Sequence, residues 1–159
     1  MNKRKTGLKA RIQGYMEDVT IDVFGYEKKV VSNVTAYLES LSKSSGIPVG
    51  DLQIRIAQPQ GKLEAHIYRL DHHLRQASFN ELVNFFMGEG ANTVFDMETK
   101  VNRSIHAYLV TYAEEKNLSL PELDIRIYKL ATQVKATSYH RGEFVSDIPI
   151  KALIKHFKG

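Results

Sequence analysis

An internal repeat limits what this chain can fold into. When the sequence is shifted by 71 positions against itself, residues 23–88 align with residues 94–159 without a gap. The alignment contains 17 identical pairs among 66, and many of the other pairs exchange one apolar residue for another. Self-similarity at a fixed spacing is typical of one structural unit that is made more than once. The sequence therefore predicts two related units joined by a short linker.

Within the unit, apolar residues follow the periods of strands and helices. Alternation of apolar and polar residues indicates half-buried strands, and apolar residues three or four positions apart indicate helices with one buried stripe. Ser78 followed by Glu81 is a capping box for the start of the last helix, and Gly88 suits its end. The expected elements of the first unit are strands at 19–23, 52–56 and 63–67, a short extra strand near Leu74, and helices over 30–41 and 79–86.

The predicted fold class is α+β, as a tandem and pseudo-symmetric duplication of a β-α-β-β-α unit with two layers. The expected organisation is a basic arm over residues 1–15 and two repeats over 16–90 and 91–159, which pack as one body because their linker is short. The predicted core consists of Val23, Val34, Leu38, Leu52, Ile54, Ile56, Leu63, Ala65, Leu82, Phe86 and the residues 71 positions after each.

The positive charge of the chain is concentrated at its beginning. The formal net charge is +4, from 22 basic and 18 acidic residues. Five basic residues precede the first acid, so the remainder of the chain is close to neutral. Such an arm can neutralise phosphates of a nucleic acid, and the alternative is a solvated terminus. The residues of this basic arm are Lys3, Arg4, Lys5, Lys9 and Arg11.

The sheet face away from the helices carries the second candidate site. By alternation, an arginine and aromatic residues point outward, and the same types recur in the second unit. An open sheet with aromatic and arginine side chains can stack bases and contact phosphates. The alternative is that the two sheets pack on each other, or on a partner chain, through this face. The residues are Phe24, Arg55 and Tyr68 with their counterparts Phe95, Arg126 and Tyr139.

Motifs for other kinds of function are missing. The chain has no cysteine, which excludes disulfides and cysteine-bound zinc. It contains no glycine-rich phosphate loop and no metalloprotease or serine-hydrolase motif. His72 and His73 are adjacent and would point to opposite sides of a strand, which disfavours a shared metal. We therefore expect no enzyme activity, cofactor or metal. No apolar run is long enough to span a membrane. The basic residues at the N-terminus are not followed by the apolar run of a secretory signal, so a cytoplasmic protein is expected. The oligomeric state stays open.

The order of helix, strands and helix resembles that of a double-stranded-RNA-binding domain, or half of a ferredoxin-like fold. The lysine cluster that such RNA-binding domains carry at the start of their last helix is absent at residues 78–81 and 147–150. A shared order of elements does not carry function. Two hypotheses follow. The first is a non-enzymatic nucleic-acid-associated protein that uses the arm and the sheet face. The alternative is a protein-interaction or scaffold module in which the same face is an interface.

Overall fold

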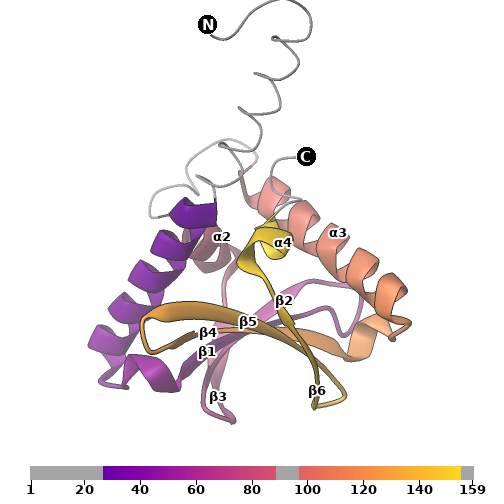
Figure 1. Ribbon diagram of the computed structural model, residues 1–159. Helices are drawn as coiled ribbons and strands as arrows, with labels where there is room; N and C mark the ends of the chain where they lie inside the picture. Colours follow the sequence, from indigo (N-terminus) through magenta and orange to yellow (C-terminus); the bar gives the residue numbers. More distant parts are fainter. Residues whose placement is uncertain (1–26, 89–96, 155–159) are drawn as a thin grey trace, which may run out of the picture.

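The structure is a computed structural model and describes residues 27–88 and 97–154. These residues form an α+β fold, in which all described helices lie on one face of an antiparallel sheet (Figure 1). The helices are residues 27–45, α2 (Phe79–Met87), α3 (Met97–Lys116) and α4 (Ile150–Ile154). The strands are β1 (Leu52–Ala57), β2 (Glu64–Arg69), β3 (His72–Ala77), β4 (Leu123–Leu130), β5 (Gln133–His140) and β6 (Glu143–Ile148).

The sheet has six strands in the order β3-β2-β1-β4-β5-β6. The extra strand that was expected near Leu74 is therefore confirmed as β3, and its counterpart is β6. The two halves meet where β1 pairs with β4, so they share one sheet edge to edge. The strands of residues 27–88 and 97–154 all belong to this one sheet, so the expected alternative in which the two halves pack sheet on sheet is wrong for them. Packing of the same face on a partner chain stays a prediction. The strand expected at 19–23 and its counterpart lie outside the described residues.

The predicted core is confirmed wherever the structure describes it, with one correction. Apart from Val134, the described members lie between the sheet and the helices and are at most 5% exposed. Val134 is only partly buried, because it lies near the end of its hairpin, where it pairs with Lys129. Val23, its counterpart Val94, and Phe157 lie outside the described residues. The structure adds Val83 and Phe85 to the core, so the buried face of α2 is broader than the predicted stripe.

The ends of the helices follow the expected chemistry. The Ser78 side chain accepts a hydrogen bond from the Glu81 amide, and the Glu81 carboxylate accepts one from the Ser78 amide, so the capping box is present. Gly88 ends α2 with a φ of 101°, and Gly46 and Asn117 follow their helices with φ values of 74° and 58°. These left-handed conformations suit glycine and asparagine. No helix in residues 27–88 or 97–154 has the length and apolar character needed to cross a bilayer.

Glu81 connects three elements on the helix side. Its carboxylate accepts hydrogen bonds from both terminal nitrogens of Arg75 on β3, at 2.8 and 2.7 Å, and from the Tyr37 hydroxyl at 2.7 Å. The Arg75 hydrogen bonds, together with those from Ser78 and Tyr37, lower the pKa of the Glu81 carboxyl to about 2. Burial and the neighbouring Glu81 raise the pKa of the Tyr37 hydroxyl. The cluster therefore stabilises the fold while Glu81 is ionised.

We expect Glu81→Gln to lower the free energy of unfolding by about 1–2 kcal/mol at pH 7, since a partly exposed charged acceptor is lost. Because the folded pKa is depressed, this stabilisation is complete above about pH 4.3, the ordinary glutamate pKa, and disappears as the pH falls toward 2. Urea unfolding of both proteins between pH 7 and pH 2 measures the difference. The exposed Glu143→Gln is the control. A constant difference across this range would contradict the role of the Glu81 charge.

Candidate nucleic-acid interface

One line of side chains crosses the helix-free face of the sheet from edge to edge. Every strand contributes one residue, and each residue contacts or pairs with the next. We call this set the transverse stripe. From β3 to β6, it consists of His73, Tyr68, Arg55, Arg126, Tyr139 and Phe144.

The centre of the stripe is an arginine pair. Arg55 on β1 and Arg126 on β4 are direct register partners, flanked by Ile54 with Ile127 and Ile56 with Ile125. Like charges directly opposite each other on neighbouring strands are destabilising. A sequence shaped only by stability would avoid this arrangement, and departures from local rules are expected at functional sites. The pair therefore favours a face that binds something.

Each arginine is held in the same way in the two halves. The Arg55 guanidinium carbon lies 3.7 Å from the centre of the Tyr68 ring, and that of Arg126 lies 3.6 Å from the Tyr139 ring. Each arginine Nε donates to the residue two positions earlier on the same strand face, which is Gln53 at 2.9 Å in the first half and Asp124 at 2.8 Å in the second. These contacts fix flat cation–aromatic pairs in place before any ligand arrives.

Aromatic rings on the edge strands extend the stripe. The His73 ring meets the Tyr68 ring edge to face at 5.3 Å, and the Phe144 ring meets the Tyr139 ring in the same manner at 5.9 Å. Phe144 is 58% exposed, which is unusual for so large an apolar side chain. The two ends thus offer ring surface beside the arginine–tyrosine pairs.

The two halves differ next to the stripe. In the first half, His66 Nδ1 lies 2.9 Å from His73 Nε2, and His66 Nε2 lies 2.9 Å from a Glu64 carboxylate oxygen. The positions that correspond to Glu64 and His66 hold Lys135 and Thr137 in the second half. The second half therefore carries an added cation where the first carries an acid, and an anionic polymer would be attracted more strongly to the second half.

The stripe is better suited to stacking than to charge neutralisation. The arginine side chains are only 14% and 11% exposed, and each has an acidic partner, Asp71 at 3.0 Å for Arg55 and Asp124 at 2.8 Å for Arg126. Asp71 is itself 95% exposed, so its ion pair is weakly held. Guanidinium planes and aromatic rings both stack on bases with little dependence on sequence.

The structure brings four of the predicted site residues together and adds two. Arg55, Tyr68, Arg126 and Tyr139 lie on one face as expected, and both tyrosines are partly exposed. Sequence reasoning missed His73 and Phe144, because a bulge interrupts the register of β2 with β3 and of β5 with β6. A bulge shifts the alternation of faces, which pattern alone does not reveal. The other predicted site residues lie outside the described residues: Lys3, Arg4, Lys5, Lys9, Arg11, Phe24 and Phe95.

In the part of the chain that the structure describes, no group of three histidines or acids is placed to hold a metal ion. Comparison of the chain with known protein families, with curated proteins and with solved structures finds no match. The chemistry of the transverse stripe therefore carries the functional interpretation.

Proposed function

We propose that this protein is a non-enzymatic nucleic-acid-binding protein whose transverse stripe stacks the bases of a single strand. The observation that supports this most is the continuity of the stripe, which places stacking side chains on all six strands. Neighbouring strands are about 4.8 Å apart, so the stripe is about 24 Å long. A single strand exposes its bases for stacking, whereas a duplex hides them.

We also infer that the halves are copies of one duplicated unit, related by a two-fold axis that passes between Arg55 and Arg126. These residues are 71 positions apart in sequence and pair directly in the sheet. A rotation that exchanges them also exchanges the pair Ile54–Ile127 with the pair Ile56–Ile125. The stripe would then contain two equivalent stacking sites. The boundaries 1–15, 16–90 and 91–159 remain predictions.

In this proposal the basic arm supplies the charge that the stripe lacks. Phosphate contacts position a protein on a nucleic acid without reading its sequence. The arm has five basic residues and, within residues 1–11, no aromatic residue. The binding is therefore expected to have weak sequence preference and two separable contributions. One depends on salt and belongs to the arm, and the other depends on ring surface and belongs to the stripe.

Deleting residues 1–11 is expected to remove most of the binding at low salt and to leave the fold intact. Each phosphate contact on a single strand contributes about 0.7 to the slope of log affinity against log salt, so loss of five contacts lowers the slope by about 3.5. Fluorescence anisotropy with labelled mixed-sequence RNA and DNA strands, at several salt concentrations, measures both effects. No binding by the full chain at low salt would overturn the proposed function. An unchanged slope would show that the arm does not contribute phosphate contacts to the binding.

The second candidate function is a protein-interaction or scaffold module that uses the same face. Exposed apolar side chains favour it, since Leu70, Leu130 and Phe144 are each more than half exposed. Exposed apolar side chains of this size are compatible with a protein partner. The same titration separates the candidates, because a module of this kind would not bind RNA or DNA strands with either form of the chain.

A further inference from the structure

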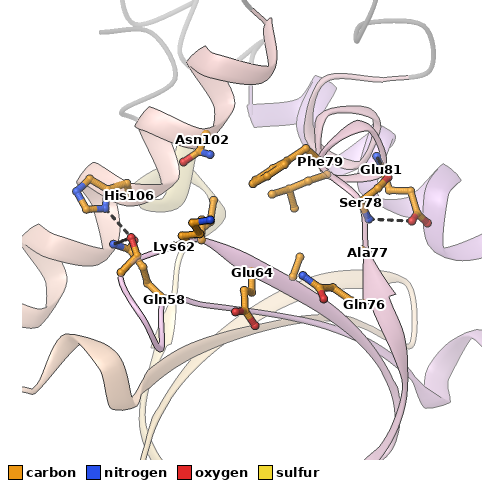
Figure 2. Close-up of a pocket in the computed structure, with 14 residues that line it drawn as sticks. Gln58, Lys62, Glu64, Gln76, Ala77, Ser78, Phe79, Glu81, Asn102 and His106 are labelled. Carbon is orange, nitrogen blue, oxygen red and sulfur yellow. Dashed lines mark hydrogen bonds between the residues drawn. The ribbon is translucent and has the colours of Figure 1, made fainter.

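A pocket of about 830 Å³ lies on the other side of the sheet from the transverse stripe, among the helices (Figure 2). Its walls come from the connection between β1 and β2, the end of β3, the start of α2 and one side of α3. Its size is within the usual range for small-molecule sites. No residue of the transverse stripe lines the pocket, although Glu64 of the lining also binds His66 beside the stripe.

A proline shapes the wall that the β1–β2 connection provides. Pro59 has no amide hydrogen for a strand ladder, and the pairing of β1 with β2 ends at Ala57 and Glu64. In the second half, β4 continues to Leu130 and β5 resumes at Gln133, so that hairpin stays paired to its tip. The connection of the first half makes no ladder pairs with the strands, and Gln58 at its start is buried. The pocket is therefore built by residues that depart from the repeat.

One side of the pocket is apolar. Leu63, Ala65, Ala77 and Leu82 are at most 9% exposed and form its inner surface. Phe79, on the first turn of α2, is 41% exposed and lines the pocket with its ring. An exposed phenylalanine beside an apolar floor provides a flat surface against which another ring can stack.

The other side is polar, and its geometry is fixed. His106 Nδ1 donates to the Gln58 side-chain oxygen at 2.8 Å, and the Gln58 amide nitrogen donates to the Gly61 carbonyl at 3.3 Å. Figure 2 shows His106 and Asn102 on α3, across the pocket from Phe79. Within the described residues, the Asn102 amide makes no hydrogen bond and so remains available as a donor.

Lys62 is the unpaired charge of this lining. Glu81 is held by Arg75 at 2.7 Å, and Glu64 by His66 at 2.9 Å, so both acids of the lining have partners. Lys62 makes no ion pair with any residue in 27–88 or 97–154. An ammonium group at the edge of an apolar pocket attracts a ligand that carries negative charge on an apolar body.

From these observations we propose that the pocket binds a small organic anion with a flat apolar body. The body packs between Phe79 and the buried floor, and the anionic group is bound by Lys62 and the Asn102 amide. Both carboxylates and phosphate esters meet this description, because either accepts charge-assisted hydrogen bonds from lysine. The site is independent of the transverse stripe.

Isothermal titration of the full chain with three naphthalene compounds tests the charge preference. We expect 1-naphthoate or 1-naphthyl phosphate to bind at least about tenfold more tightly than 1-naphthylmethylamine, which carries a positive charge. A difference between the two anions identifies a carboxylate or a phosphate ester as the preferred class, and equal binding supports their shared chemistry. Equal binding of the amine, or no binding by either anion at millimolar concentration, would overturn the proposal.

Two variants place the binding in this pocket. Lys62→Met should weaken the binding of both anions about tenfold and leave the binding of the amine unchanged. Phe79→Ala should weaken the binding of all three compounds. Lys135→Met is the matched control, because it removes a lysine from the opposite face of the sheet. If Lys62→Met binds the anions as tightly as the original protein does, the anions bind somewhere other than this pocket. That result would contradict the assigned site.

Discussion

Replacement of both Tyr68 and Tyr139 by alanine is expected to abolish most of the salt-resistant binding to single-stranded nucleic acid. Loss of an aromatic stacking partner costs about 1–3 kcal/mol per base. Two such losses amount to about 2–6 kcal/mol, which is at least about a thirtyfold loss of affinity. Each substitution also removes the ring on which Arg55 or Arg126 is stacked. The effect is largest near 1 M salt, where the Debye length is about 3 Å and the contribution of the arm is screened.

Matched variants separate the ring from the hydroxyl group and from the charge. Phenylalanine at both positions retains the stacking surface, so Tyr68→Phe with Tyr139→Phe should bind within about threefold of the original protein. Arg126→Gln removes the repulsion between the central arginines and also removes the contact of Arg126 with the Tyr139 ring. These two effects oppose each other, so the free energy of unfolding should stay within about 1 kcal/mol of that of the original protein. Equal affinity of the alanine variant and the original protein at high salt would exclude the stripe as the interface.

Local patterns were sufficient to predict most of the described fold. Apolar alternation in residues 52–56 and 63–67 located two strands, and the spacing of Val30, Val34 and Leu38 located a buried helix stripe. The cap residues marked the helix ends. These features depend on side chains close together in sequence, so a single sequence contains them. Alternation also identified the outward direction of Arg55 and Tyr68.

The sequence did not reveal how the two halves meet. Pairing of β1 with β4 joins residues far apart in sequence, such as Arg55 and Arg126, and either edge pairing or sheet-on-sheet packing satisfied the same apolar pattern. The predicted sheet-face site lacked His73 and Phe144 because it, too, depends on strand pairing. The bulges that bring these two residues beside the tyrosines are properties of pairs of strands. The pocket was missed as well, because Lys62 and Asn102 line one cavity only after the strands and α3 have packed.

The largest expected effect on stability is at Phe86. This side chain is 1% exposed, lies at the packed side of α2 and contacts the Phe85 ring edge to face at 4.9 Å. Truncation of a buried phenylalanine to alanine costs about 3–5 kcal/mol, from lost transfer free energy and the cavity that remains. A domain of this size has about 5–15 kcal/mol of stability, so Phe86→Ala should lose a large fraction of it. Thermal and urea unfolding measure the change.

Phe79 on the same helix provides the control. It has the same side chain and is 41% exposed, and its substitution by alanine removes ring surface that is already in contact with water. We expect Phe79→Ala to change the free energy of unfolding by about 1 kcal/mol or less. Similar losses for the two variants would mean that α2 does not pack against the sheet as described. A large loss for Phe86→Ala alone would confirm the packing, because only the buried ring of the two then contributes to the core.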